Sequence, residues 1–299
     1  MSEANTPLAG EDEASVMRGA LGKAIANLPK PVRFRAENAF HGFEKAVALL
    51  AVDREMASFR AITAEEEAAA ALFRSLQLRR YPGANGLNLG NHRHKAAVGP
   101  FIWAVRSTLG GKGFVKQAQM TLDYAAPSLQ LHLPLHELGV VFPGSEDMRL
   151  TFTEPLGLTR RKGPDEALDR FGKELAELAS AQSFANIHAL IAKEANARNR
   201  LLYASDAAPP ITRVTPAAIL ARRDRADICL FLCIAIMQTR AHQAFALQAL
   251  DAFLEMVGKM PDQPIHHAPA PQRGIQFIVH GDRPTTVQEF GSILSADDE

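Results

Sequence analysis

The stretch RNRLLY carries four side chains of types that can bind and cleave a phosphate ester. They are Arg198, Asn199, Arg200 and Tyr203, and they lie at the end of a helix predicted from about Phe184. Residues three to five positions apart share a helix face, so two guanidinium groups, an amide and a phenol can converge on one phosphate. The alternative is that these are ordinary polar residues at a helix end, before the SDAAPP loop.

The sequence predicts neither a metal nor a cofactor. His132 and His136 alternate with leucines, which predicts a half-buried β-strand, where residues four apart are separated by about 13 Å and cannot share one ion. The glycine-rich stretches GANGLNLG and LGGKGF match neither a phosphate-binding loop nor a dinucleotide-binding loop. Cys229 and Cys233 fall on one apolar helical face and are predicted to be core residues.

Three consecutive acids, Glu65, Glu66 and Glu67, open an alanine-rich segment that follows Thr63. Thr63 and Glu66 have the spacing of a capping box, which predicts that a helix begins there. In that interpretation the three acids form the first turn, where they interact favourably with the helix dipole. The alternative is that two of them form a pair of acid–base carboxylates.

The charge composition excludes a globally basic nucleic-acid-binding protein, because 33 Lys and Arg residues balance 33 Asp and Glu residues among 299. Local basic clusters remain. They would form one phosphate-binding face only if the fold brought them together, and otherwise they are scattered solvated charges. The clusters are Arg79–Arg80, Arg93–Lys95, Arg160–Lys162 and Arg222–Arg225.

The sequence is typical of a cytoplasmic protein. Its acidic, polar start lacks the basic and apolar regions of a secretion signal. No apolar segment approaches the roughly 20 residues that span a bilayer, so we expect no membrane association. Two cysteines alone predict no disulfide framework.

Helical periodicity dominates the chain and is interrupted once by period-two patterning. We therefore predict a mainly α fold, a helical bundle interrupted by a small antiparallel β-sheet insertion. The predicted organisation is a disordered tail at 1–14, the first helical part at 15–112, the β-rich insertion at 113–154, the second helical part at 155–260, and a Pro-rich loop with one strand and an acidic tail at 261–299.

Proline marks two helix starts in the second helical part. Pro164 stands at a first-turn position before an amphipathic segment. Thr215 and Pro216 form a cap and first-turn pair that opens a glycine-free stretch to Val257, long enough for one helix or two abutting ones.

Three separated stretches resemble the AbiV-type abortive-infection proteins of the HEPN superfamily, which are prokaryotic helical bundles. AENAFHGFEKAVALL with FRAITAEEEAAAALF resembles the opening helix pair of that family. HRHKAAVGPF is similar to its histidine–lysine element, here His92 and Lys95. RNRLLYASD with PAAIL is similar to its basic Leu-Tyr segment before a proline and a long helix.

The resemblance implies roles for the RNRLLY residues. Many HEPN proteins are metal-independent ribonucleases and usually dimers. Arg198 would then stabilise the scissile phosphate, Asn199 would be its polar partner, and Tyr203 would occupy the position of the family's acid–base histidine. The tyrosine departs from the family pattern, because a tyrosine with a pKa near 10 is a poor base at neutral pH.

We therefore expect a dimeric, toxin-like protein of antiviral defence that acts on RNA, as an endoribonuclease or a weakened RNA binder. His92, Lys95 and Arg200 would bind the substrate. The alternative is a non-catalytic helical scaffold that binds a partner protein through its sheet insertion or its long apolar helix. In the enzyme, Arg198 and Tyr203 should face His92 or Lys95 in a cleft or across a two-fold axis. In the scaffold they should point separately to solvent.

Overall fold

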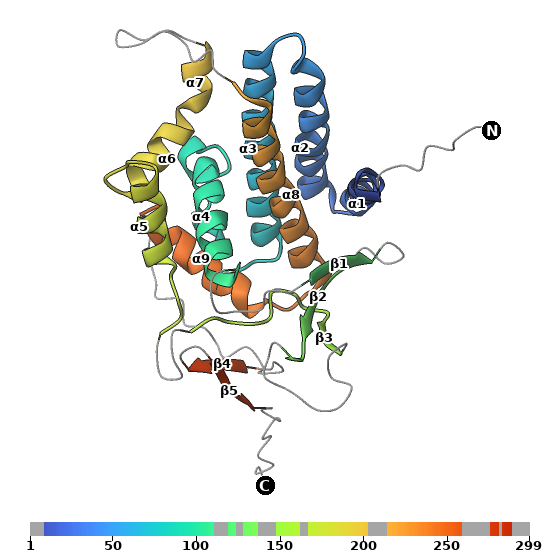
Figure 1. The fold of residues 1–299 in the computed structure, drawn as a ribbon, viewed down its shortest axis with the longest axis vertical. Helices are drawn as coiled ribbons and strands as arrows, with labels where there is room; N and C mark the ends of the chain where they lie inside the picture. The colour runs from blue at the N-terminus through green and yellow to red at the C-terminus, as the bar shows by residue number, and fades with distance from the viewer. Residues whose placement is uncertain are drawn as a thin grey trace, which may run out of the picture.

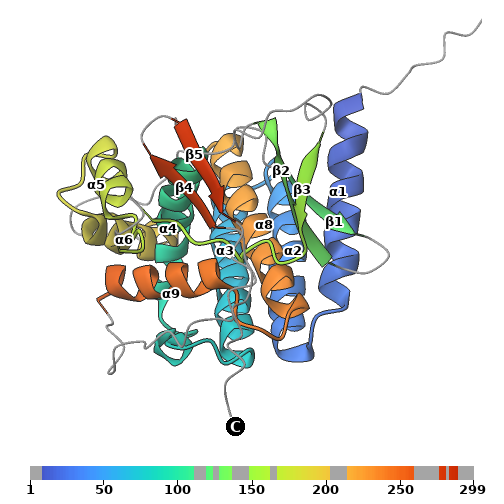
Figure 2. The same cartoon turned by 90° about the horizontal axis from the view of Figure 1, so that it is seen from below.

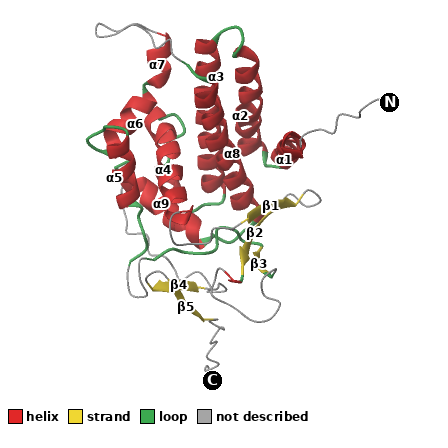
Figure 3. Ribbon diagram, in the orientation of Figure 1, coloured by secondary structure: helices red, strands yellow, loops and turns green. Residues whose placement is uncertain are grey.

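A computed structural model of the chain describes residues 9–110, 119–123, 128–136, 148–161, 167–202, 214–258, 276–280 and 283–288. These residues are mainly helical with a small antiparallel sheet, as predicted (Figures 1 and 3). The helices are α1 (Ala9–Ala26), α2 (Lys30–Leu49), α3 (Arg54–Leu78), the 3-10 helix η1 (Ala84–Gly86), α4 (His92–Gly110), α5 (Gly172–Ala181), α6 (Ile187–Ala195), α7 (Ala197–Leu202), α8 (Pro216–Gln238) and α9 (Ala244–Met256). The strands are β1 (Gln119–Asp123), β2 (Ser128–Pro134), β3 (Arg149–Phe152), β4 (Gln276–His280) and β5 (Arg283–Gln288).

Helix α3 lies at the centre of the helical part. It packs most extensively against α2 and α8, while α4 lies between it and the short helices α5 and α6 (Figure 1). In Figure 2, which views the molecule from below, α9 crosses in front of α3 and α4. Helices α2 and α3 pack closely at Gly42, which has no side chain. A Cβ atom added to Gly42 would lie only 2.8 Å from the Cβ atom of Ala64. The small buried residues of α3 are Ala57, Ala61, Ala64, Ala68, Ala69, Ala70 and Ala71.

The predicted helix start at Thr63 is wrong. Helix α3 begins at Arg54, where the Asp53 carboxylate accepts a hydrogen bond from the Met56 amide at 2.8 Å and caps the helix. Thr63 lies inside the helix, and its hydroxyl donates to the carbonyl of Phe59. The acids that follow Thr63 are therefore side chains of the middle of a central helix, placed to contact its neighbours.

Two helix predictions in the second helical part also need correction. The helix expected from Pro164 begins only at Gly172. Pro164 itself lies outside the described residues, but Leu168 is not helical, because it forms an antiparallel bridge with Arg161. The single helix predicted beyond Phe184 is two short helices, α6 and α7.

The long stretch opened by Thr215 forms two helices, α8 and α9. The Thr215 side chain accepts a hydrogen bond from the Ala218 amide, and Pro216 is the first residue of α8, which confirms the predicted start. Burial raises the pKa of both cysteines of α8, that of Cys233 to about 12. Cys229 and Cys233 are thus core thiols, as predicted, and stay protonated near neutral pH. Within the ranges that can be searched, no helix is both long and apolar enough to cross a membrane.

The three-stranded sheet has the order β1-β2-β3 and is antiparallel throughout. Its strands fall within the predicted insertion, and β2 contains the alternating leucines. The ring of His132 lies between the hydroxyl groups of Thr121 at 2.7 Å and Thr151 at 2.9 Å. The imidazole of His132 therefore links the two outer strands on the polar face of the sheet. The strand predicted near the C-terminus is β4, which pairs with β5.

Three glutamines hold strand β2 and the chain between the sheet and α5 against the helical part. Gln238 at the end of α8 bonds both the amide and the carbonyl of Leu129, at 2.8 and 2.9 Å. Gln248 of α9 bonds both backbone groups of Arg160 at 2.9 Å. Gln243 bonds a backbone amide of the segment between them at 2.9 Å. Gln238 and Gln248 thus each bond a residue as a neighbouring strand would, and Gln243 adds a single bond; we call these three residues the glutamine clamp.

Candidate functional site

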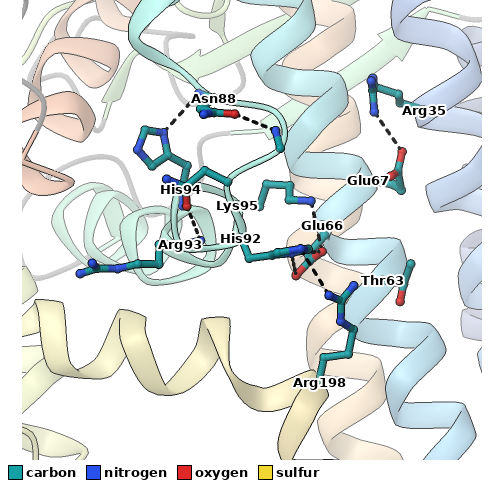
Figure 4. Close-up of polar contacts among 12 residues, drawn as sticks. Arg35, Thr63, Glu66, Glu67, Asn88, His92, Arg93, His94, Lys95 and Arg198 are labelled. Atoms are coloured by element: carbon teal, nitrogen blue, oxygen red, sulfur yellow. Dashed lines mark hydrogen bonds and ion pairs between the residues drawn. The ribbon is translucent and has the colours of Figure 1, made fainter.

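Four charged or titratable side chains from three helices meet beside the centre of α3 (Figure 4). Oε2 of Glu66 lies 2.9 Å from Nδ1 of His92 and 3.2 Å from Nζ of Lys95. Nη2 of Arg198 lies 3.3 Å from Nε2 of His92. Glu66, His92 and Arg198 thus form a continuous chain of polar contacts, with Lys95 at its inner end. We call these four residues the Glu66 cluster.

The first turn of α4 sets the direction of two of these side chains. The Asn91 side chain accepts hydrogen bonds from the amides of Arg93 at 2.8 Å and His94 at 3.4 Å, which caps the helix. His92 and Lys95 are three positions apart in this turn and therefore share one face. Because α4 runs beside α3, that face meets Glu66.

The Glu66 cluster has a buried end and an open end. The side chains of Glu66 and Lys95 are each 9% exposed, whereas that of His92 is 43% exposed. The free-energy cost of burying the Glu66 carboxylate is compensated because Lys95 pairs with it directly. A buried, paired carboxylate therefore orients an imidazole ring that solvent and ligands can reach.

The contacts of His92 indicate its tautomer. A guanidinium group only donates hydrogen bonds, so Nε2 accepts from Arg198 and the ring proton lies on Nδ1. Nδ1 then donates to the Glu66 carboxylate at 2.9 Å. A neutral ring with an electron pair on its exposed nitrogen is the form that accepts a proton in acid–base catalysis.

The neighbouring acid, Glu65, points toward α8 instead. Its carboxylate accepts hydrogen bonds from Arg222 at 2.5 Å and from Arg225 at 2.6 Å, and Arg222 also bonds Glu194 of α6 at 3.0 Å. Burial alone would raise the pKa of Glu65, but the two guanidinium groups outweigh it, so the pKa is lowered. This ionised network ties α3, α6 and α8 together on one side of the site.

A cleft of about 270 Å³ adjoins the Glu66 cluster. Glu66 and Lys95 form part of its wall, and the rest comes from α3, α4, α5, α6 and α8, including Trp103 and Arg222. The cleft therefore has room for a ligand beside Glu66 and Lys95, whereas His92 and Arg198 are not among its lining residues.

Arg198 faces His92, the arrangement expected for the enzyme, and Lys95 lies in the same cluster. The fold does not bring Asn199 there: its amide donates to the Asn196 side chain at 3.1 Å. Arg200 is exposed and forms no hydrogen bond to the Glu66 cluster within the described chain. Tyr203 lies outside the described residues.

The site residue whose preferred interpretation from the sequence was wrong is Glu66. The capping-box interpretation places it in the first turn of a helix, where its role would be local. The available signal is its context, because Glu66 stands among the alanines of α3 that are buried against other helices. A buried acid in such a position requires a basic partner from elsewhere in the chain.

Several residues of the four basic clusters pair inside the fold. Arg222 and Arg225 pair with an acid of α3. Arg160 pairs with a buried aspartate at 3.2 Å, and Arg79 donates to a carbonyl at the end of α8. With Lys95, which pairs with Glu66, at least five of the ten Lys and Arg residues of these clusters are therefore engaged inside the fold.

No group of three or more His, Cys, Asp or Glu side chains within the searched part of the chain is arranged to hold a metal ion. No family model, no curated protein sequence and no solved structure matches the chain at a significant level.

Proposed function

We propose that this protein is a metal-independent endoribonuclease of the HEPN-like, abortive-infection type that its sequence resembles, with His92 as the acid–base group. The observation that carries the proposal is the contact of Arg198 with the exposed nitrogen of an imidazole that Glu66 orients. The proposal includes a cytoplasmic dimer acting in antiviral defence, which the sequence resemblance supports.

His92 would start the reaction. Its Nε2 accepts the proton of a ribose 2′-hydroxyl while the 2′-oxygen attacks the adjacent phosphorus. The bond from phosphorus to the 5′-oxygen then breaks, and the 5′-oxygen takes up a proton from water. The imidazolium returns its proton to water. The products are a 2′,3′-cyclic phosphate and a 5′-hydroxyl.

The other members of the Glu66 cluster would support this step. Arg198 would leave Nε2 when RNA binds and donate to the phosphate oxygens, where negative charge grows in the transition state. Glu66 would hold the ring tautomer and stabilise the imidazolium. Lys95 would pair with the buried Glu66 carboxylate and hold it in place.

This assignment transfers the acid–base role from Tyr203, where the sequence resemblance puts it, to His92. The chemical reason is that a neutral imidazole accepts a proton near pH 7 far more readily than a phenol. The structural support is that His92 and Arg198 are in contact although they come from different helices.

The test is a cleavage assay on a structured RNA with EDTA present. Wild type should cut the RNA and leave 2′,3′-cyclic phosphate ends, and His92→Ala and Arg198→Ala should each lower the rate at least about 100-fold. His188→Ala and Arg240→Ala are matched controls, since both residues are exposed and lie outside the Glu66 cluster. Cleavage that persists in His92→Ala would overturn the proposal.

If the wild type cleaves no RNA, the alternative is a scaffold that binds a partner protein. One observation favours a role for the sheet there: β1 and β3 are its two edges, and an edge strand can pair with an extended peptide. Most large apolar residues of α8 are buried or half-buried and Leu220 alone is exposed, so that helix offers no comparable surface.

A further inference from the structure

Trp103 is the only tryptophan of the chain, and it lies on the wall of the cleft beside the Glu66 cluster. It is 40% exposed. A large aromatic ring that stays accessible in a concave site is the kind of group that stacks on a ligand ring. The proposed ribonuclease chemistry does not use it.

One face of α4 leads from the acid–base group to this tryptophan. Lys95, Gly99 and Trp103 all line the cleft at intervals of four residues, so they share a helix face. His92 precedes Lys95 by three positions on the same face. Eleven residues separate His92 from Trp103, which is about 16 Å along a helix. A strand cut at His92 can therefore reach Trp103 with a nucleotide a few positions from the cleaved bond.

The charged groups of the cleft are already paired with one another. Lys95 pairs with Glu66, and both arginines of α8 pair with Glu65 or Glu194. The cleft therefore presents no unpaired charge among its lining residues, which suits a neutral, flat ligand and not a phosphate. The charged lining residues are Glu65, Glu66, Lys95, Glu194, Arg222 and Arg225.

Two polar groups in the cleft wall are free to recognise such a ligand. Gln182 follows α5, is exposed, and its side-chain amide bonds to none of the described residues. The carbonyl of Ala96 lacks its usual donor within α4, because residue 100 is a proline and has no amide proton. An amide side chain and a backbone carbonyl are groups that hydrogen-bond to the edge of a base.

We propose that this cleft holds a nucleobase of the RNA, stacked on Trp103 with its edge toward Gln182. The inference rests on the proposed function for the identity of the ligand. The volume of about 270 Å³ lies near the lower end of the range for ligand pockets, roughly 300 Å³, which suits one base. The cleft would thus select which nucleotide lies near the cleaved bond.

The first experiment uses the fluorescence of Trp103, which no other tryptophan obscures. Wild-type protein in EDTA is titrated with AMP, CMP, GMP and UMP, and with ribose 5-phosphate, which lacks a base. We expect a saturable change with at least one nucleotide, none with ribose 5-phosphate, and weaker binding in Gln182→Ala. The same change with ribose 5-phosphate, or none with any nucleotide, would overturn the inference.

The second experiment measures binding of a 2′-deoxy-substituted oligonucleotide, which cannot be cleaved, by fluorescence anisotropy. Trp103→Ala should weaken binding roughly 5- to 100-fold, the range for loss of one base stack, and Trp103→Phe should recover part of it. Phe34→Ala is the control, because Phe34 is an exposed aromatic residue of α2 outside the cleft. Equal affinities of wild type and Trp103→Ala would refute the inference.

The two proposals fail in different ways. Cleavage by wild type with an unchanged KM in Trp103→Ala would refute the base site and leave the ribonuclease intact. A saturable fluorescence change without any RNA cleavage would support the base site and refute the catalytic role of His92.

Discussion

Arg198 and His92 are 106 positions apart in the chain, yet Nη2 of the guanidinium group lies 3.3 Å from Nε2 of the imidazole. The contact joins the short helix α7 to the first turn of α4. It exists only while the ring is neutral, because a protonated ring has no electron pair to accept it. An anion that drew the guanidinium away would therefore expose the nitrogen that we propose as the base.

Glu66→Gln should show how much the charge of Glu66 contributes to catalysis by His92. The substitution keeps the shape of the side chain but removes the charge that pairs with His92 and Lys95. We expect kcat for RNA cleavage to fall roughly 10- to 1000-fold, with KM changed little, because the imidazolium loses its partner. Steady-state kinetics with EDTA present measure both constants.

The matched control is Glu67→Gln, one residue along α3. Glu67 pairs with Arg35 of α2 at 3.5 Å and lies outside the Glu66 cluster. The activity of the Glu67→Gln variant should stay within about twofold of wild type, as expected for a surface pair. Equal losses in the two variants would show that the effect comes from the helix and not from the cluster.

Asp227 should make stability depend on pH. Burial raises the pKa of Asp227 from 3.8 to about 6, although Arg18 of α1 lies 3.5 Å away. A raised pKa means that the folded state binds the proton more tightly than the unfolded state does. The contribution to stability is therefore complete below pH 3.8 and is lost as the pH rises through about 6.

Asp227→Asn imitates the protonated acid and should remove this dependence. We expect a higher free energy of unfolding than wild type at pH 7.5, by at most about 3 kcal/mol, and a difference close to zero at pH 4. Urea unfolding at both pH values measures it, with Glu177→Gln as an exposed control. A gain of the same size at both pH values would contradict the assignment.

Gly42→Ala should destabilise the protein even though alanine favours helices. The new Cβ atom would lie 2.8 Å from the Cβ atom of Ala64, so α2 and α3 must move apart. We expect a loss of roughly 1 to 3 kcal/mol in the free energy of unfolding. Gly19→Ala is the control: it has nothing within 4 Å and should add about 0.5 to 1 kcal/mol.

Gln248→Glu should test the glutamine clamp. The amide nitrogen of Gln248 donates to the carbonyls of Arg160 at 2.9 Å and Asp169 at 2.8 Å, and a carboxylate cannot donate to either. We expect a loss of at least about 2 kcal/mol at pH 7, because two buried acceptors would face a negative charge. Gln182→Glu, at an exposed position, should change the melting temperature little.

The elements of the fold were predictable where the signal lies in neighbouring residues. Thr215 before Pro216 marks the start of α8, and the leucines of β2 mark a strand. The start of α3 was not predictable, because Asp53 and Thr63 both precede helical segments and the sequence does not show which of them caps the helix. Only the packing of α2 against α3 distinguishes them.

The candidate site was predictable in its basic members and not in its acid. His92, Lys95 and Arg198 are found by residue type and by resemblance. Glu66, the partner of His92 and Lys95, is recognised only when α3 and α4 lie side by side. A contact between residues this far apart in the chain depends on the tertiary fold, which no local pattern encodes.

The glutamine clamp also bears on how the protein loses its structure. If the sheet and the segment that follows it detached together, Gln243 and Gln248 would be left in the helical part without the backbone groups of Leu156 and Arg160, and both side chains are now at most 2% exposed. Stranding buried polar groups is costly, so the sheet and helices are coupled into one cooperative unit and not two that melt in turn. The β-strands thus interrupt the helices in sequence but do not form a module that could be exchanged between proteins.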